Sequence, residues 1–278
     1  MRKTIIVADS SADMLQMQGV PFAAAPLKIV TDTREFVDNA ALDVGEMVAW
    51  FETYKGKSQT SCPNPGDWLE AFGDAEDVFC VTITSGLSGS YNSACVAKQM
   101  YESEHVGRRV CVIDSLSAGP ELTLIIEKLE EMVAQGLEFD QICSRIKEYQ
   151  QKTGLTFMLK SLKNFAANGR VSPAVAKIAG VLGICIVGKA SDQGTLEPTH
   201  KCRGESKSLN AIVEHLKESG LQKGKVRLAH CMNEAAANEL KKRILALLPE
   251  VDVKIHVLRG LCSYYAEKGG LLVGFEKM

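Results

Sequence analysis

Short apolar runs that alternate with helical patterns constrain this chain more than any other feature of its sequence. Three of these runs, Thr4–Ala8, Val78–Ile83 and Val110–Ile113, are rich in β-branched residues, and a polar or glycine-rich turn follows each. Apolar residues repeat at helical spacing over 122–133 and 142–149. Strands that alternate with helices are typical of a parallel sheet covered by helices, so the first part of the chain is predicted to be a Rossmann-like α/β domain.

The pattern changes near residue 155, where we place a domain boundary. Beyond it, helices and a hairpin-like turn at 191–194 separate the strand candidates, which are Leu155–Leu159, Ile184–Val187, Val226–His230 and Val251–Leu258. The sequence therefore predicts an α/β protein of two domains. Residues 1–155 form the N-terminal parallel-sheet domain, and residues 156–278 form a C-terminal α/β (α+β) domain.

Composition places the chain among globular proteins and disfavours several partners. Its 278 residues are 46% hydrophobic, and its formal net charge is −2 without a block of like charges, so no binding to nucleic acid or an anionic membrane surface is expected.

The apolar run 5–8 is too short for a signal peptide, and the uncharged stretch 178–189 is too short to span a bilayer. Nine scattered cysteines indicate free thiols and a cytoplasmic location. Five histidines without metal spacing predict no metal site, and no cofactor is expected.

The segment Thr84–Tyr91 is the most informative loop. It reads Thr-Ser-Gly-Leu-Ser-Gly-Ser-Tyr, follows a strand and precedes a helix predicted over 92–101. Glycines expose backbone N–H groups, and the N-terminus of the next helix carries partial positive charge, so the loop is predicted to hold a carboxylate or a phosphate. The alternative is that Ser88 or Ser90 merely caps the helix. The loop matches neither a Walker loop nor a nucleophile elbow, so NTP hydrolysis and esterase chemistry are not supported.

Three further polar segments are candidates for ligand binding or for turns. The segment 58–68 contains several hydroxyl side chains and two prolines, is read as a turn, and places Asp67 at the start of the next helix. The segment 9–13 follows the first strand, where hydrogen bonding to neighbouring loops is favoured over metal binding. Arg170 precedes a helix predicted over 173–179, with Ser172 as its N-cap and Pro173 as its first residue. Arg170 suits an acidic head group and a surface salt bridge equally well.

The order of these motifs resembles that of the DegV family of bacterial fatty-acid-binding proteins over essentially the whole chain. The two most specific matches are Thr60–Asn64, which looks like the family's Thr-Ser-x-Pro-Ser loop, and Ser85–Ala94, which is very close to its hydroxyl-rich glycine loop. Asp9–Asp13 resembles the family's first-strand signature. Gly169–Ser172 resembles part of its Gly-Gly-Arg-Ile element, with Asn168 in place of the first glycine.

The resemblance implies that one long-chain fatty acid, such as palmitate, stearate or oleate, lies between the two domains. Its tail is expected in the apolar core of the C-terminal domain, and Thr60 and Ser88 are expected to hydrogen-bond its carboxylate. The full set of residues expected at the carboxylate is Thr60, Ser61, Ser85, Ser88, Gly89 and Arg170. The resemblance further implies a non-catalytic carrier, which presents the fatty acid to a fatty acid kinase for phospholipid synthesis.

Two positions depart from the family pattern. Where many relatives carry a His-Thr-Gly-Pro-Gly element, residues 263–270 read Ser-Tyr-Tyr-Ala-Glu-Lys-Gly-Gly, so the histidine that helps to bind the carboxylate is missing. The lysine-proline pair after the Arg170 helix is replaced by Cys185-Ile186. These departures bear on coupling to a kinase more than on lipid binding.

Two other functions stay open at this point. The chain could be an enzyme acting on a small phosphorylated or carboxylated metabolite in a polar interdomain cleft. Ser85 or Ser88 and Arg170 would then bind the anion, and Asp9 or Asp114 would act as acid or base. The chain could also be a sensor whose conformation reports lipid supply. The sequence gives the enzyme hypothesis little support, because no motif ties a base to a candidate nucleophile.

Overall fold

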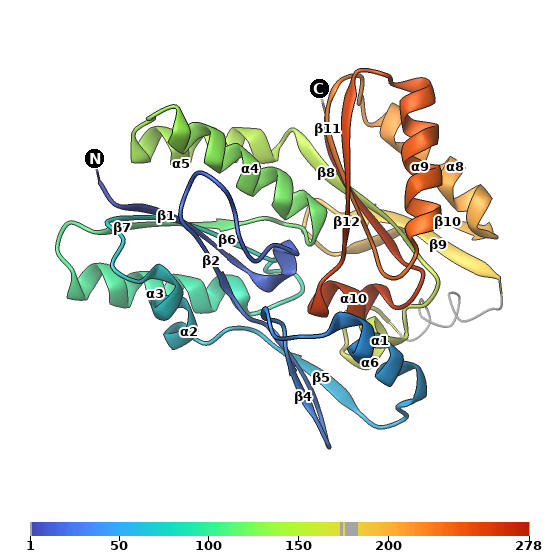
Figure 1. The fold of residues 1–278 in the computed structure, drawn as a ribbon, viewed down its shortest axis with the longest axis horizontal. Coiled ribbons are helices and arrows are strands. Elements are labelled where there is room, and N and C mark those ends of the chain that lie inside the picture. Colours follow the sequence, from blue (N-terminus) through green and yellow to red (C-terminus); the bar gives the residue numbers. More distant parts are fainter. Residues whose placement is uncertain (1, 173–174, 176–182, 278) are drawn as a thin grey trace.

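A computed structural model describes residues 2–172, 175 and 183–277, which form three β-sheets with helices around them (Figure 1). The first sheet has four parallel strands in the order β2-β1-β6-β7. Its strands are β1 (Thr4–Asp9), β2 (Phe22–Ala25), β6 (Asp77–Thr82) and β7 (Arg109–Asp114). Because the strands are parallel, the loops that follow β1, β6 and β7 leave the same edge of the sheet.

The second sheet has six strands of mixed direction in the order β10-β9-β8-β13-β11-β12. Only β11 and β12 pair in parallel, and every other neighbouring pair is antiparallel. Its strands are β8 (Thr153–Leu159), β9 (Ile184–Ala190), β10 (Leu196–Arg203), β11 (Gly224–His230), β12 (Val251–Val257) and β13 (Leu271–Glu276). The predicted turn at 191–194 is confirmed, since it joins β9 to β10 as a hairpin.

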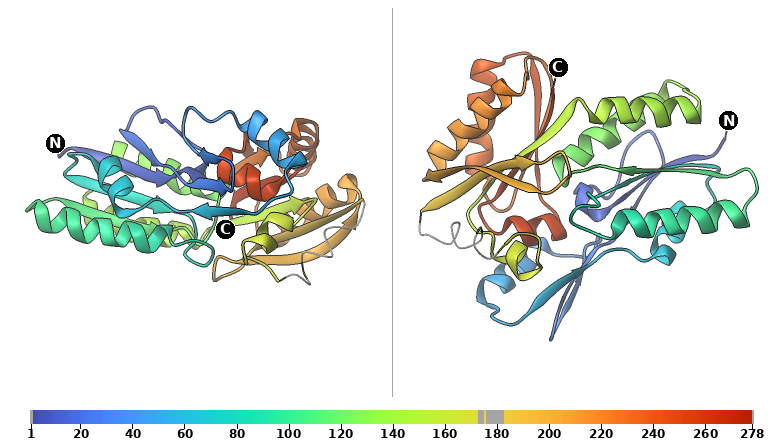
Figure 2. Two further views of the ribbon diagram at one scale, coloured as in Figure 1. Left: turned by 90° about the horizontal axis from the view of Figure 1, so that it is seen from below. Right: turned by 180° about the vertical axis from the view of Figure 1, so that it is seen from behind.

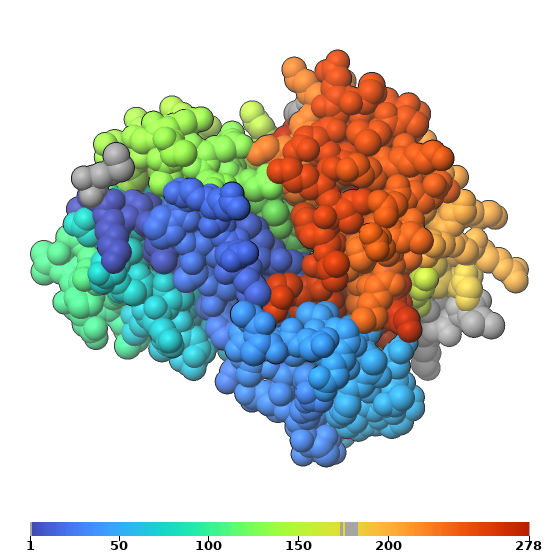
Figure 3. Space-filling view, viewed as in Figure 1, coloured from blue at the N-terminus to red at the C-terminus, as the bar shows by residue number. Residues whose placement is uncertain are grey.

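The third sheet is a small antiparallel one that extends away from the parallel sheet (Figure 2). Its strands, in the order β4-β3-β5, are β3 (Lys28–Thr31), β4 (Glu35–Val37) and β5 (Ser58–Ser61). Helix α1 (Val44–Thr53) follows β4, and in the space-filling view its light blue atoms lie against the red C-terminal segment (Figure 3). Phe51 of α1 meets Tyr264 edge-on at 5.0 Å between ring centroids.

Helices cover both faces of the parallel sheet because successive side chains of a strand point to opposite sides. Ile6 and Ala8 of β1 pack against α4 (Pro120–Ala134) and α5 (Phe139–Gln150). Val7 packs on the other side, against α2 (Pro65–Phe72) and α3 (Ser90–Glu104). Figure 1 shows these two helix pairs above and below the sheet.

The six-stranded sheet also has two different faces. One packs against α8 (Glu205–Glu218) and α9 (Glu234–Leu247), where Leu228 and Leu240 belong to one apolar cluster. The other face belongs to a second cluster with α1 and α10 (Gly260–Ala266), and α6 (Lys163–Ala167) contributes Phe165 to it. This second face turns toward the carboxyl edge of the parallel sheet, which places it opposite the polar loops.

The predicted fold class is confirmed, since the chain is a mixed α/β protein with one parallel sheet and a second mixed sheet. Each strand predicted by its apolar run corresponds to an observed one, and the helices predicted over 92–101, 122–133 and 142–149 are α3, α4 and α5. The helix predicted over 173–179 lies outside the described residues except at Val175, whose N–H donates to Oγ of the predicted N-cap Ser172 at 3.3 Å. The domain boundary at residue 155 stays a prediction.

Two local predictions need correction. The segment 58–61 is not part of a turn but the strand β5, whose sequence Ser-Gln-Thr-Ser lacks the apolar residues that signal a strand. Helix α2 does not begin at Asp67. Asn64 is its N-cap, Pro65 is its first residue, and Asp67 completes a capping box by accepting a hydrogen bond from the Asn64 backbone N–H at 2.8 Å.

Two findings concern the membrane and the cysteines. Within residues 2–172, 175 and 183–277, no helix combines the length and the apolar character that crossing a bilayer requires. All nine cysteines are free thiols, as predicted.

Candidate functional site

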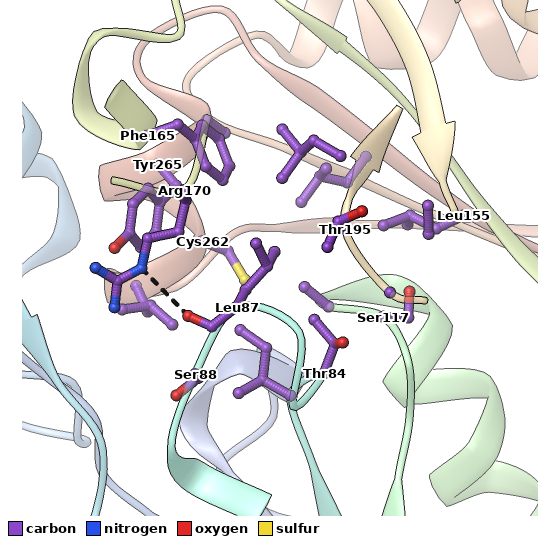
Figure 4. Close-up of a pocket in the computed structure, with 18 of the residues that line it drawn as sticks. Thr84, Leu87, Ser88, Ser117, Leu155, Phe165, Arg170, Thr195, Cys262 and Tyr265 are labelled. Atoms are coloured by element: carbon purple, nitrogen blue, oxygen red, sulfur yellow. Dashed lines mark hydrogen bonds between the residues drawn. The ribbon is translucent and has the colours of Figure 1, made fainter. Parts of the chain in front are cut away.

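A cavity of about 310 Å³ lies between the carboxyl edge of the parallel sheet and the inner face of the six-stranded sheet. Its volume is at the lower end of the range of small-molecule sites, roughly 300–1,000 Å³. Figure 4 shows Arg170, Tyr265 and Ser88 at one side of it and Leu155 at the other. Most of its wall is apolar, and the leucine, isoleucine and phenylalanine residues that line it are Leu27, Ile83, Leu87, Leu155, Phe157, Leu159, Phe165, Leu196, Leu261 and Leu272.

Strand β8 supplies the largest apolar part of this wall because of its alternating sequence. Leu155, Phe157 and Leu159 are spaced by two, so they share one face of the strand, and all three line the cavity. Met158 points to the opposite face and packs in the cluster beneath α8 and α9. A strand that is buried on both faces can therefore contribute to a core and to a binding cavity at once.

The polar end of the cavity is built from β5, α10 and the loop before α3. Thr60 of β5 and Tyr265 of α10 both line the cavity, and their hydroxyl oxygens are 2.8 Å apart. Ser88 lines it from the loop, and its Oγ accepts a hydrogen bond from the Ser90 N–H at 3.2 Å. That bond uses a lone pair of Ser88, so its proton stays available for a ligand. Helix α3 begins here with Gly89 as its N-cap, which adds partial positive charge.

Asp9 fixes the position of this loop through buried hydrogen bonds. Its side chain is fully buried, and it accepts hydrogen bonds from the Ile83 N–H at 2.8 Å, the Ser90 hydroxyl at 2.6 Å and Ser11. Burial raises the pKa of Asp9, although these hydrogen bonds oppose the shift. The prediction that the segment after β1 bonds to neighbouring loops is thereby confirmed. The bond from Ser90 also shows that this serine does not cap α3.

Arg170 lies at the polar end but has backbone partners. Its Nε donates to the carbonyl oxygen of Leu87 at 3.2 Å (Figure 4), and Nη1 donates to the carbonyl oxygen of Asn168. Among the described residues it forms no salt bridge. Arg170 therefore ties the glycine-rich loop to the segment after α6 and brings a positive charge to the cavity wall.

The remaining residues expected at the carboxylate lie in two different places. Ser61 and Gly89 line the cavity beside Thr60 and Ser88. Ser85 is exposed and is not among the lining residues, and its backbone N–H donates to Asp114 at 3.1 Å. We therefore omit Ser85 from the site proposed below.

The residues assigned to acid or base catalysis in the enzyme hypothesis have structural roles instead. Asp114 accepts hydrogen bonds from the N–H groups of Ser85 and Leu116, both at 3.1 Å, and fixes the two loops at the carboxyl edge. Neither Asp9 nor Asp114 lines the cavity. In the described part of the chain, no three His, Cys, Asp or Glu side chains gather as metal ligands would.

Sequence reasoning missed Tyr265 and Thr84. Thr84 is buried and lines the cavity, but the motif drew attention to the serines beside it. Tyr265 lies in the segment that departs from the family pattern, so the resemblance offered no role for it. A helical spacing argument could have placed Tyr265 with Leu261 on one face of α10, since i and i+4 residues are neighbours.

The whole chain is similar to proteins of one family. It matches the model described as "Uncharacterised protein, DegV family" over residues 3–277. The chain belongs to the DegV family. A DegV domain-containing protein of Streptococcus pneumoniae is 42% identical over 275 residues, which cover 98% of each chain.

Solved DegV structures resemble this chain over nearly its whole length. A DegV protein of Eubacterium eligens loaded with heptadecanoic acid has a TM-score of 0.97 and 45% identity, and the match covers 99% of this chain and 100% of that one. The Fatty Acid Kinase B3 protein of Streptococcus pneumoniae, loaded with linoleic acid, has a TM-score of 0.97 and 41% identity with the same coverage. A DegV protein of Ruminococcus gnavus, refined with vaccenic acid, has a TM-score of 0.90 and 26% identity, with 98% and 99% coverage.

Proposed function

We propose that this DegV protein binds one long-chain fatty acid in the cavity between its two large sheets. The observation that carries the proposal is the shape of the cavity, whose long apolar wall ends at hydroxyl groups and at the N-terminus of α3. An acyl chain matches the wall, and a carboxylate matches the hydroxyls and the helix terminus. The three similar structures described above each contain a long-chain fatty acid.

In this proposal the tail packs against β8, β13 and α10, and the carboxylate lies at Thr60 and Ser88. Ser61, Gly89 and Arg170 complete the polar end. Burying about fourteen methylenes at roughly 0.8 kcal/mol each supplies on the order of 11 kcal/mol before the cost of association. A hydrogen bond to a charged group adds only about 1.5–3 kcal/mol. The tail therefore supplies most of the affinity, and the hydroxyls orient the head group.

A series of saturated fatty acids tests this assignment. Affinity measured by calorimetry is expected to rise about fourfold per methylene from laurate to palmitate, because each methylene buries further apolar surface. The variant Leu155→Trp obstructs the cavity and should abolish uptake, whereas Val106→Trp, at a fully exposed position, should bind like the wild type. An affinity that does not depend on chain length would contradict the proposal.

We further propose that this protein is a non-catalytic carrier that presents the fatty acid to a fatty acid kinase. The kinase transfers the γ-phosphoryl group of ATP to the bound carboxylate, and this chain contributes the substrate. The similarity to the Fatty Acid Kinase B3 protein supports the role, and the nine free thiols fit a cytoplasmic site of action. Acyl-phosphate formation by a fatty acid kinase is expected to depend on this protein. A loaded protein that supports no phosphorylation by kinases of related bacteria would contradict the carrier role without affecting fatty acid binding.

A further inference from the structure

Two adjacent tyrosines of α10 join it to β5 in different ways. Tyr265 faces the cavity, with its hydroxyl 2.8 Å from Thr60 Oγ1 and its ring 4.6 Å from that of Phe165. Tyr264 does not line this cavity, and its hydroxyl is 2.7 Å from Ser58 Oγ. The side chains of these neighbours point about 100° apart around the helix, so one of them reaches the proposed head-group site and the other does not.

The number of hydroxyl protons on Thr60 and Tyr265 fixes which of the two donates to the other when an anion is bound. A threonine hydroxyl has one proton, and a carboxylate has none and only accepts. A bond to an ionised group is about twice as strong as one between neutral groups, so the Thr60 proton goes to the carboxylate. The bond between the two side chains must then be donated by Tyr265. Burial raises the pKa of Tyr265, which keeps its phenol protonated and able to donate.

We propose that Tyr265 is a positioning residue for the ligand head group. Its hydroxyl donates to Thr60 Oγ1 and thereby directs the Thr60 proton at the carboxylate. This inference rests on the proposed function, and it assigns a role to a residue of the segment that departs from the family pattern. Ser88 provides the second donor, so the site offers two donors to two carboxylate oxygens.

Such a site selects by head-group chemistry rather than by charge alone. A carboxylate accepts from both donors, whereas a primary amide of the same shape offers one acceptor and one NH2 donor. The amide must then turn its carbonyl oxygen to Thr60 and its NH2 group to Ser88, where the Ser90 N–H already occupies one lone pair, so wild-type protein should bind it more weakly than the acid. Without the Tyr265 hydroxyl, Thr60 is free to rotate and accept from the amide.

The test compares palmitate with palmitamide by calorimetry in wild type, Tyr265→Phe and Tyr264→Phe. Tyr265→Phe keeps the ring against Phe165 and removes only the hydroxyl. We expect it to weaken palmitate about 10-fold and to strengthen palmitamide, because only the acid needs the directed proton and the released Thr60 hydroxyl can accept from the amide. Tyr264→Phe removes a hydroxyl from the same helix outside the cavity and should leave the ratio of the two affinities unchanged.

A second series tests whether Tyr265 acts through Thr60. In a Thr60→Val background, Tyr265→Phe is expected to cause no further loss of acid selectivity, since the proton that it directs is gone. Thr60→Ser keeps the hydroxyl and should retain the selectivity. If Tyr265→Phe folds poorly, the selectivities of Thr60→Val and Thr60→Ser still test the role of the directed proton.

Four outcomes would overturn the inference. Equal effects of Tyr265→Phe on palmitate and palmitamide would show that the hydroxyl only supports the packing of α10 on β5 and does not direct a proton at the head group. Additive effects of Thr60→Val and Tyr265→Phe would show that the two side chains act independently. A wild-type protein that binds palmitate and palmitamide equally well would overturn this inference alone, whereas failure of wild type to bind palmitate at all would overturn the proposed function as well.

Discussion

The parallel sheet and the six-stranded sheet are joined at two contacts of opposite character. At the closed contact, α4 packs directly on β11 and β13, and a fully buried arginine crosses between them. At the hollow contact, the loops after β6 and β7 face β8 and α10 across the cavity. The closed contact sets the separation of the sheets, so the hollow one can leave space for a ligand without loss of the fold.

The charges at the two contacts differ in the same way. At the closed contact, the Arg227 guanidinium donates two bonds of 2.7 Å to Glu127 of α4, and its side chain is 1% exposed. Burial by itself raises the pKa of Glu127, but the ion pair with Arg227 outweighs it and holds the pKa below its usual value. Near the hollow contact, Asp13 lies behind the cavity wall at the start of α10, where it accepts from the Arg259 N–H at 2.6 Å, while its Oδ2 is buried without a hydrogen-bond partner among the described residues. The buried charged groups are therefore paired where the sheets meet tightly, whereas near the cavity one carboxylate oxygen of Asp13 has no partner among the described residues.

The largest effect is expected from Arg227→Ala, which removes the two short bonds to Glu127 at the closed contact and leaves Glu127 only Lys225, 3.4 Å away. Removal of one partner of a buried ion pair costs about 3–5 kcal/mol, so the free energy of unfolding in urea should fall by that amount. Arg34→Ala breaks the exposed ion pair with Glu46 and should cost at most about 1 kcal/mol. Equal losses of unfolding free energy in the two variants would show that the ion pair at the closed contact stabilises the fold no more than an exposed one.

A smaller loss is expected from Gly274→Ala. A Cβ atom at Gly274 of β13 would lie 2.5 Å from the carbonyl carbon of Pro120 at the start of α4, and backbone cannot yield as a side chain can. Overpacking of this kind costs about 1–3 kcal/mol, measurable by thermal unfolding. Gly45→Ala in α1 meets no atom closer than 3.3 Å and should be neutral or stabilising by up to about 1 kcal/mol. A fully stable Gly274→Ala protein would show that the closed contact is not tightly packed.

The hollow contact is expected to make stability depend on pH through Asp13. Burial raises its pKa from 3.8 to about 8, so the folded state binds a proton that the unfolded state releases between these values. The stabilisation that protonated Asp13 adds to the free energy of unfolding is fully present below pH 3.8 and is lost as the pH rises through 8. Asp13→Asn, which mimics the protonated form, should flatten the decline in unfolding free energy between about pH 5 and 8. An unchanged slope in urea titrations at several pH values would contradict this assignment.

The smallest effect on stability, with a clear effect on binding, is expected from Ser88→Ala. The change removes one proposed hydrogen bond to the carboxylate and should weaken palmitate binding about 10-fold. Unfolding free energy should fall by at most about 1 kcal/mol, because Ser88 is only partly buried and its Oγ accepts a single hydrogen bond, from the Ser90 N–H. Ser85→Ala, in the same loop but outside the cavity, is the matched control and should bind normally. Equal binding losses for both variants would mean that the cavity wall has been assigned wrongly.

The sequence predicted the parts of the site that short local motifs encode, which are strand β8 and the hydroxyl-rich loop before α3. The alternating Leu155, Phe157 and Leu159 indicated a strand, and the hydroxyl-rich loop indicated a ligand at the carboxyl edge of a parallel sheet; the cavity lies between these segments. Both signals come from residues close together in the chain, which is the information that propensity and periodicity contain.

What the sequence did not predict depends on contacts between distant residues. Tyr265 and Thr60 are 205 positions apart, and no spacing rule relates them. Strand β5 is polar, and most of β10 is exposed at the edge of its sheet, so neither has the apolar run that signals a strand. The pairing of Arg227 with Glu127 likewise joins two segments whose proximity follows only from the assembled fold.

The most direct test of the central claim is mass spectrometry of the small molecules released when the purified protein is denatured. A fatty acid held by an apolar wall of this extent should survive purification. We predict recovery of about one C16–C18 fatty acid per chain, and loss of that fatty acid in Leu155→Trp but not in Val106→Trp. An empty wild-type protein that also fails to take up added palmitate or oleate would contradict fatty acid binding by this chain.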